Sequence, residues 1–372
     1  MVAPAATRAG GRAAPADYMD RALFHASRGR GRTSPNPMVG AIVVSPDGVI
    51  VGQGYHERAG EPHAEVRALD EAGARARGAT LYCTLEPCCH VGRTGPCVAR
   101  IVDAGIARVV AAVADPNPKV SGQGFAYLTA RGVDLEVGLG AGPAVRLNQP
   151  FFTWMRERRP FVVLKAATSL DGRIAEAPGR RTRLTSDEAN RHAQRIRAEV
   201  DAIAVGSGTI LADDPRLTAR GAFRERPLAR VIFDRRLRTP PSARVLSTLE
   251  AGPVIIVTSP GAAALRERRN PLEARGVQIE EVREPTFRAG LERLGELNIE
   301  SLLLEGGAAL HGAAWDADLV DFVRLYVAPV TIGPAGVPWL EGRSFSSAEL
   351  IESRVEPLGP DVLIEGYVHG PR

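Results

Sequence analysis

The residues of this chain that could do chemistry gather in one short stretch. All four cysteines lie between Cys83 and Cys97, and His63 stands shortly before them. His63, Cys88 and Cys97 together offer one imidazole and two thiols, which are ligand types that zinc prefers. Three protein ligands leave a fourth position open for water, and bound zinc lowers the pKa of that water to about 7. The sequence therefore predicts a catalytic zinc site.

Two other cysteines compete for the same role. Cys83 and Cys89 lie close enough in the sequence to be ligands themselves. We favour Cys88 because it directly follows Pro87, and a Pro-Cys pair belongs to the pattern described in the next paragraph. Cys83 falls in an expected buried strand, residues 79–84, where a cysteine is usually a small apolar core residue.

A carboxylate two residues after His63 completes the pattern. Glu65 can accept a proton from a water and pass it to a leaving amine, as a general acid–base group does. His-x-Glu followed by Pro-Cys and a further Cys resembles the signature of zinc nucleobase deaminases, in which the Glu is not a ligand. An isolated His-x-Glu is common, so the interpretation depends on the whole set. We predict Glu65 as the catalytic residue of a deaminase.

The spacing of the two cysteines departs from the general deaminase pattern. That pattern has Cys-x-x-Cys, whereas eight residues separate Cys88 from Cys97 here, within the segment EPCCHVGRTGPC. This long loop resembles that of the riboflavin-pathway deaminases. From about Asp17 to the C-terminus the chain resembles the bifunctional riboflavin biosynthesis deaminase–reductases. The resemblance implies zinc-dependent deamination of a diaminopyrimidine ribosyl phosphate, then NADPH-dependent reduction of its ribose to a ribityl chain.

Length and composition favour a two-domain globular enzyme. A chain of 372 residues is longer than one typical domain, and 44% hydrophobic with 24% charged residues is ordinary for such proteins. No apolar run approaches the ~20 residues of a membrane span. The clustered cysteines argue for metal binding in a reducing compartment, so we expect a cytoplasmic protein.

The basic charge balance first suggests nucleic acid as a partner, because the net charge is +4 and the pI is near 9.1. Only 5% of the residues are aromatic and able to stack on bases. We therefore attribute the excess of basic residues to the binding of phosphate-bearing small-molecule substrates and to solvated surface. We expect no nucleic-acid or membrane partner, and the sequence leaves a homo-oligomer open.

Four segments are expected along the chain. We expect a disordered tail at residues 1–16 and the zinc deaminase domain at residues 17–142. A linker is expected at residues 143–160 and the reductase domain at residues 161–372. The tail is rich in Ala, Arg, Gly and Pro and lacks acids, so it imitates an organelle transit peptide, although we favour disorder. The linker carries Phe151, Phe152, Trp154 and Met155, which predict a short connecting helix packed on one or both domains.

The first domain alternates short strands and helices. Apolar runs at 39–44 and 49–54 flank Pro46-Asp47-Gly48, which predicts a hairpin. Strands at 79–84 and 109–113 and helices at 64–73 and 96–104 follow. We therefore expect a cytidine-deaminase-like α/β/α fold.

Two loops supply further candidates for the deaminase pocket. Asn36 stands between two prolines before the first strand. The resemblance implies that this motif lines the pyrimidine pocket, so we predict Asn36 as substrate-binding; a plain turn is an equal alternative. Asp115, Asn117 and Lys119 match another family segment, which either helps to hold the substrate or forms a solvated turn.

The second domain repeats strand and helix in turn. Buried strands are expected at 161–166, 202–205, 229–233, 254–258 and 301–304, and helices at 187–197, 287–297 and 308–314. Strands that alternate with helices predict a mostly parallel sheet, which binds ligands at the carboxyl ends of its strands.

Three ordered motifs point to a reductase. Glu305-Gly306-Gly307 joins a strand to a helix, where glycines let the backbone approach a pyrophosphate, although a tight turn explains them equally well. Segments 169–173 (SLDGR) and 209–218 (TILADDPRLT) resemble motifs of the riboflavin-pathway reductases. Those enzymes share the fold of dihydrofolate reductase, so the resemblance implies that α/β fold for residues 161–372.

Carried over residue by residue, the resemblance implies two sets of contacts. Those to NADPH are Ala167, Arg183, Thr209, Asp213, Arg235, Gly307, Ala308, Ala309, Leu310, His311, Gly312 and Ala313. Those to the ribosyl phosphate are Lys165, Arg181, Arg197, Leu217, Arg220 and Glu305. Arg183 departs from the family, which usually has a Trp there; a guanidinium can stack but lacks the flat apolar face.

Two other functions compete with this one. The basic pI favours a nucleic-acid (tRNA-type) deaminase with an accessory binding domain, and the SLDGR and LADDP segments count against it. Arg183 alone favours a deaminase fused to a catalytically weak ribose-phosphate-binding domain. We therefore expect a bifunctional enzyme whose cofactors are NADPH and one zinc ion per deaminase domain.

Overall fold

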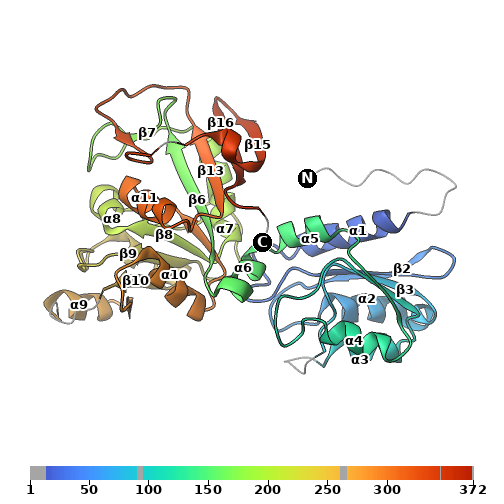
Figure 1. The fold of residues 1–372 in the computed structure, drawn as a ribbon. Helices are drawn as coiled ribbons and strands as arrows, with labels where there is room; N and C mark the ends of the chain where they lie inside the picture. The colour runs from blue at the N-terminus through green and yellow to red at the C-terminus, as the bar shows by residue number, and fades with distance from the viewer. Residues whose placement is uncertain (1–13, 90–94, 260–265, 344, 371–372) are drawn as a thin grey trace. The chain divides into compact units, whose positions relative to one another are not determined.

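The computed structural model of the chain describes residues 14–89, 95–259, 266–343 and 345–370 (Figure 1). The chain divides into two compact units, Met1–Arg156 and Glu157–Arg372. Of the expected tail, residues 1–13 lie outside the described part, whereas Pro15 already begins helix α1 (Pro15–Ser27). Among the described residues, no helix combines the length and the apolar character needed to span a membrane.

A five-stranded sheet forms the centre of the first unit. Its strands are β1 (Gly40–Val44), β2 (Ile50–Tyr55), β3 (Thr80–Cys83), β4 (Arg108–Ala111) and β5 (Asp134–Val137), in the order β2-β1-β3-β4-β5. β1 runs antiparallel to β2 and β3, whereas β3, β4 and β5 are parallel. The carboxyl ends of β3 and β4 therefore share one edge, where the loops with Cys88 and Asp115 leave the sheet.

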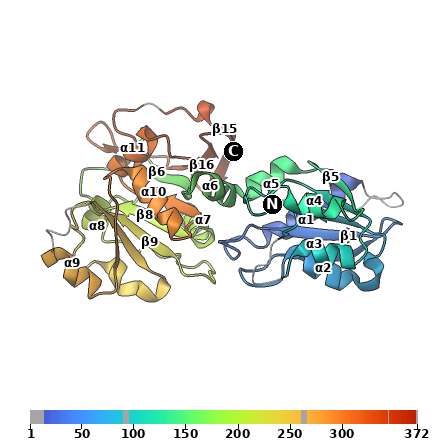
Figure 2. The ribbon, with the colours of Figure 1, turned by 60° about the horizontal axis from the view of Figure 1, so that its bottom comes forward.

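Helices cover both faces of this sheet (Figures 1 and 2). α1 and α5 (Ala141–Leu147) pack on one face through a cluster that includes Met19, Ile42 and Ala144. The other face carries α2 (Ala64–Ala72), the turn η1 (Gly73–Ala76), α3 (Cys97–Asp103) and α4 (Gln123–Thr129). The first unit is thus the α/β/α sandwich that the sequence predicts.

Helix α6 (Gln149–Glu157) contains the aromatic cluster of the expected linker. The sequence predicts one short helix within residues 143–160, and the structure has the end of α5 and all of α6 there. Phe151 and Phe152 are buried in the core of the first unit, and Trp154 and Met155 pack against that core.

A nine-stranded sheet forms the centre of the second unit. In spatial order its strands are β11 (Gln278–Glu281), β10 (Val254–Thr258), β9 (Ala229–Phe233), β8 (Ala202–Gly206), β12 (Ser301–Leu304), β6 (Phe161–Thr168), β13 (Phe322–Val327), β16 (Asp361–Tyr367) and β15 (Ile351–Leu358). The strands from β11 to β13 are parallel, and β16 and β15 are antiparallel additions. Two short strands, β7 (Arg173–Ala175) and β14 (Val337–Pro338), pair separately. The predicted mostly parallel sheet is confirmed.

The two faces of the nine-stranded sheet have separate cores. One core includes Ile203, Ile232 and Ile256 and receives α7 (Asp187–Glu199), α8 (Ser207–Asp213), η2 (Arg244–Ala251) and α9 (Arg266–Glu273). The other includes the alternate strand residues Ala204, Val231 and Val257 and receives α10 (Phe287–Glu296) and α11 (Ala308–Asp316). A short turn, η4 (Ser347–Glu349), precedes β15.

A buried ion pair links the start of β6 to the start of β13. Arg159, which is 1% exposed, donates from Nη1 and Nη2 to Asp321 Oδ2 and Oδ1 at 2.6 and 2.8 Å. Asp321 Oδ2 also accepts the Val162 N–H at 2.7 Å. The pair therefore helps to set the register in which Val163 lies opposite Phe322.

Candidate functional site

Three segments around the sheet of the first unit bring the predicted zinc ligands together. His63 immediately precedes α2, Cys88 follows β3, and Cys97 is the first residue of α3. Their ligand atoms lie within 4.8 Å of one another, and His63 Nδ1 is 3.4 Å from Cys88 Sγ and 3.3 Å from Cys97 Sγ. Tetrahedral zinc with ordinary Zn–N and Zn–S bonds would hold such atoms about 3.5 Å apart. The donor types and their spacing therefore fit one zinc ion.

The structure separates these ligands from the two competing cysteines. Cys83 Sγ is fully buried and donates to the Val110 carbonyl at 3.8 Å. Cys89 Sγ donates to the Lys119 carbonyl at 3.7 Å. Neither belongs to the cluster that could hold a metal among the described residues, so the geometry favours Cys88.

The two thiols of the cluster have pKa values that are shifted in opposite directions. Hydrogen bonds from Cys97 and His63 lower the pKa of Cys88, although burial opposes them, and the bond to Cys88 raises the pKa of His63 to about 9. Cys97 has its own hydrogen bond with Cys88, and this bond together with burial raises the pKa of Cys97. A bound divalent cation would favour the thiolate form of both cysteines and the neutral form of the imidazole, which are the forms that ligate a metal.

Glu65 lies beside this cluster in the first turn of α2 and is 3% exposed. Burial raises the pKa of Glu65 to about 7, against the lowering effect of His63. A carboxyl group that titrates near neutral pH can both accept and donate a proton. The arrangement can therefore activate a water and protonate a leaving group.

A cavity of about 450 Å³ opens onto His63, Glu65 and Cys88. Asn36 lines it, and its Nδ2 lies 3.0 Å from His56 Nε2, while His56 Nδ1 lies 3.3 Å from the Pro62 carbonyl. A proton on Nδ1 lets His56 donate to Pro62 and accept from Asn36, which leaves the Asn36 carbonyl oxygen for a ligand. The rest of the lining includes Asp115, Asn117, Phe151, Trp154 and Met155, but not Lys119.

In the second unit, a cavity of about 510 Å³ gathers most of the residues predicted for the reductase. The predicted residues that line it are Lys165, Ala167, Arg181, Arg197, Thr209, Asp213, Leu217, Arg220, Glu305, Gly307 and His311. Arg216 and Arg244 line it too, although the sequence did not single them out. We call this cavity the sugar cavity.

The charges of the sugar cavity are arranged around Glu305. Arg197 donates from Nε and Nη2 to the two oxygens of Glu305 at 2.8 and 2.6 Å, and Lys165 Nζ lies 4.0 Å from Oε2. Burial alone would raise the pKa of Glu305, but Arg197 and Lys165 lower it to about 2. Burial and the neighbouring Arg197, Arg216 and Arg181 lower the pKa of Arg220. An anion bound among these arginines would relieve their repulsion.

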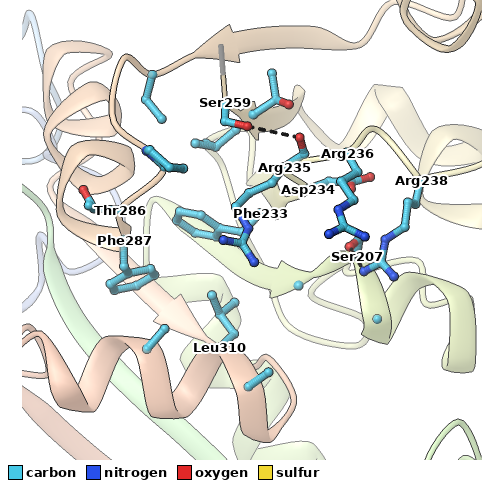
Figure 3. Close-up of a pocket in the computed structure, with 18 residues that line it drawn as sticks. Ser207, Phe233, Asp234, Arg235, Arg236, Arg238, Ser259, Thr286, Phe287 and Leu310 are labelled. Carbon is cyan, nitrogen blue, oxygen red and sulfur yellow. Dashed lines mark hydrogen bonds between the residues drawn. The ribbon is translucent and has the colours of Figure 1, made fainter. Parts of the chain in front are cut away.

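A second cavity of about 520 Å³ lies at the carboxyl ends of β8, β9 and β10 (Figure 3). Phe233, Phe287 and Leu310 form its apolar side, and the Phe233 and Phe287 ring centroids are 5.0 Å apart. Arg235, Arg236, Arg238 and Ser207 form its polar side, where Arg238 Nη2 donates to Ser207 Oγ at 2.7 Å. We call this cavity the arginine cavity; the predicted residues that line it are Arg235, Ala309, Leu310 and Ala313.

The two cavities of the second unit meet at the turn between β12 and α11. Gly206 and Leu310 line the arginine cavity, whereas Thr209, Gly307 and His311 line the sugar cavity. The start of α11, where the helix dipole favours an anion, lies between them. A ligand with an anionic group at the start of α11 and one further group in each cavity would fit this arrangement.

Three predicted cofactor residues line neither cavity. Arg183 is exposed and pairs with Asp187 on α7. Ala308 and Gly312 lie one helical turn apart on α11, and a Cβ at Gly312 would lie 2.8 Å from Arg343 Nη1. Residues 309, 310 and 313 of the same helix line the arginine cavity, so neighbouring positions of this helix face different surroundings.

Sequence reasoning missed Ser207, Arg236 and Arg238 in the arginine cavity and His56 in the cavity of the first unit. A signal for the arginines existed. Arg235-Arg236-Leu237-Arg238 begins one residue after Asp234, which directly follows the buried strand β9. Side chains that follow a parallel strand lie at the ligand-binding edge of the sheet.

Comparison with known proteins matches one family to each unit. Residues 14–113 match the cytidine and deoxycytidylate deaminase zinc-binding region, and residues 160–364 match the RibD C-terminal domain. Riboflavin biosynthesis protein RibD of Aquifex aeolicus is 41% identical over 354 residues, which cover 94% of this chain and 97% of that protein. The Escherichia coli protein of the same name is 40% identical over 359 residues, 93% of this chain and 97% of that protein.

Solved structures give the same result. Acinetobacter baumannii RibD (form 1) has a TM-score of 0.84 at 35% identity and covers 95% of this chain and 98% of its own. A Thermotoga maritima diaminohydroxyphosphoribosylaminopyrimidine deaminase/5-amino-6-(5-phosphoribosylamino)uracil reductase has a TM-score of 0.80 at 32% identity, with the same coverage. The predicted fold class, a cytidine-deaminase-like domain before a dihydrofolate-reductase-like domain, is confirmed. The chain belongs to the RibD family of riboflavin biosynthesis proteins, which join a zinc-dependent deaminase to a reductase.

Proposed function

We propose that the chain carries out two consecutive steps of riboflavin biosynthesis. The first unit hydrolytically deaminates a diaminopyrimidine ribosyl phosphate, and the second reduces the ribose of the product to a ribityl chain with NADPH. The observation that carries the proposal is the cluster of His63, Cys88 and Cys97, which meets Glu65 at one cavity, in a chain that also has a reductase unit.

In the deamination, the residues of the first unit bind, orient and move protons. His63, Cys88 and Cys97 would hold zinc, which acts as a Lewis acid and lowers the pKa of a coordinated water to about 7. Glu65 accepts the proton of the attacking water and delivers it to the departing amino group, so that ammonia leaves. The Asn36 carbonyl oxygen, oriented by His56, accepts an N–H of the pyrimidine edge. Phe151 and Trp154 supply apolar surface for the ring.

For the reduction, the arginine cavity supports NADPH as the proposed hydride donor. Arg236 and Arg238 project toward the same side as Ser207, away from Phe287 and Leu310 (Figure 3). Guanidinium groups bind phosphate oxygens with paired N–H donors, so this side suits the 2′-phosphate that distinguishes NADPH from NADH. The apolar side suits the adenine. The start of α11 suits the pyrophosphate, and the nicotinamide of a cofactor held there would face the sugar cavity.

The sugar cavity binds the substrate phosphate and the ribose. Arg181, Arg216 and Arg220 supply the positive charge for the phosphate, because Arg197 is engaged with Glu305. The reduction adds a hydride at C1 and a proton at the ring oxygen released when the ribose opens. Lys165 Nζ, which lines this cavity beside Glu305, would deliver that proton. The protein orients both reactants, and the nicotinamide carries the hydride.

The proposal extends to the compartment and the partners. All four cysteines are free thiols, and thiols that serve as metal ligands persist in a reducing environment such as the cytoplasm. The substrate is a small molecule, and neither nucleic acid nor membrane is required for either step.

The test is to follow ammonia release and NADPH oxidation by the purified chain supplied with the diaminopyrimidine ribosyl phosphate. We expect ammonia without added NADPH, and NADPH oxidation only after deamination. A metal chelator should stop ammonia release and leave the reduction of deaminated substrate intact. Chelator-insensitive ammonia release, or no NADPH oxidation with the deaminated product, would contradict the proposal.

A further inference from the structure

Glu86 is a buried carboxylate that the chemistry described above does not use. It lies between β3 and Cys88, is 3% exposed, and accepts four backbone N–H groups. Its Oε2 accepts from Asp115 at 3.2 Å and Gly122 at 3.0 Å. Its Oε1 accepts from Gly124 at 2.9 Å and Phe125 at 3.3 Å, which are first-turn donors of α4 without partners in the helix.

These bonds join two segments that form different parts of the same cavity. The segment of Glu86 also carries Leu85 and the metal ligand Cys88, and the Glu86 N–H donates to the Val113 carbonyl at 2.9 Å. The accepted N–H groups belong to a segment that carries Asp115, Asn117 and Val120, all of which line the cavity. We call this second segment, residues 115–125, the cavity wall.

The packing of α4 against the metal-binding segment is independent evidence of the same junction. A Cβ added at Gly124 would lie 2.2 Å from the Pro87 carbonyl oxygen and 3.1 Å from Glu86 Oε1. Only glycine permits this approach, because backbone atoms cannot give way as a flexible side chain can. Pro87 directly precedes Cys88, so α4 touches the metal-binding segment next to its ligand.

We propose that Glu86 is a positioning residue for deamination. It fixes the cavity wall at a set distance from Cys88 and Glu65, so that a pyrimidine in the cavity lies against a fixed surface. The inference rests on the deaminase function proposed for the first unit. A glutamine would retain one accepting oxygen and turn an NH₂ group toward two N–H donors, so the wall would move away on that side. Misplacement of reactants by about 1 Å can cost about 10²-fold in rate.

Glu86→Gln and Gly124→Ala test the junction from its two sides, with Thr84→Val as the matched control. Thr84 is also fully buried in this segment, and its Oγ1 accepts the Gly40 N–H at 3.1 Å, away from the cavity wall. We expect both test variants to keep one zinc per chain and normal reduction of deaminated substrate. Their kcat for deamination should fall by about 10–10²-fold with KM changed less than about threefold. The kcat of the double variant should be no lower than that of the less active single variant, because both changes open the same junction.

Three results would overturn the proposal. They are an unchanged kcat in Glu86→Gln, a loss of zinc that accounts for the whole effect, and an equal fall in kcat in Thr84→Val. If the unaltered chain itself releases no ammonia, the deaminase function fails instead, so the two failures are distinguishable.

Discussion

Arg197 and Glu305 form a two-pronged, largely buried ion pair that joins α7 to the turn after β12, with N···O distances of 2.8 and 2.6 Å. The family resemblance implies that both residues contact the substrate. In the structure each is the other's main partner, so Arg197 holds the Glu305 carboxylate in place at the carboxyl edge of the sheet. Under the proposed function, Glu305 then presents a fixed acceptor to the ribose.

Arg197→Ala should impair both reduction and stability. It leaves Glu305 buried without its partner, which typically costs about 3–5 kcal/mol of unfolding free energy. Arg197→Lys keeps the charge but loses the paired N–H geometry, so its loss should be smaller. Urea unfolding and NADPH oxidation measure the two effects. Arg191→Ala is the control, because Arg191 lies on the same helix in an exposed pair with Glu188; an equal cost there would refute the account.

His311 should make the second unit sensitive to acid. Burial lowers the pKa of His311 to about 4 from 6.5, although its bond to the Trp339 carbonyl opposes the shift. The unfolded chain therefore binds this proton more tightly, so stability is full above pH 6.5 and falls as the pH drops toward about 4. The loss should reach about 3 kcal/mol at most. Unfolding followed against pH should show a flatter profile for His311→Gln between those limits, and parallel profiles would contradict the assignment.

Glu65→Gln should abolish deamination while sparing the metal. A glutamine fills the same space but cannot carry the proton, so kcat should fall by about 10²–10⁴-fold. Zinc content and the reduction of deaminated substrate should stay normal. Glu71→Gln on the same helix is the control, since Glu71 is exposed and its carboxylate accepts the Gln53 N–H, away from the metal cluster. Normal ammonia release by Glu65→Gln would remove Glu65 from the mechanism.

Arg236→Ala and Arg238→Ala should weaken the preference for NADPH over NADH. Each removes a cation from the polar side of the arginine cavity, so kcat/KM should fall by about 10–10²-fold with NADPH and little with NADH. Steady-state rates with the two coenzymes give the ratio. Arg275→Ala, an exposed arginine outside both cavities, should leave it unchanged. Equal losses with both coenzymes would place the 2′-phosphate elsewhere.

Local spacing was enough to predict the metal cluster, because His63, Glu65 and the Pro87-Cys88 pair lie at the ends of short elements whose order is visible in the sequence. The Pro-Cys pair also predicted Cys88 in preference to Cys89. The structure adds the physical reason, because the loop after β3 turns Cys88 toward His63 and Cys89 toward the Lys119 carbonyl.

The arginine cavity shows what the sequence supplied only in part, since the family resemblance pointed to Arg235 alone. Arg236 and Arg238 look like solvated surface until β8, β9 and β10 are known to be parallel neighbours, because only then do the loops that follow these strands share an edge. Strand β15 was missed for a related reason. It is an edge strand whose residues are mostly exposed, so it lacks the apolar run that reveals buried strands. Helix α4, only seven residues long with a glycine in its first turn, gave no clear helical period.

Zinc content of single-residue variants tests the central claim most directly. Metal analysis of the purified chain should find one zinc per molecule, and His63→Ala, Cys88→Ser and Cys97→Ser should each lose it, whereas Cys89→Ser should keep it. Zinc that survives in all three of the first variants, or that disappears with Cys89→Ser alone, would contradict the account.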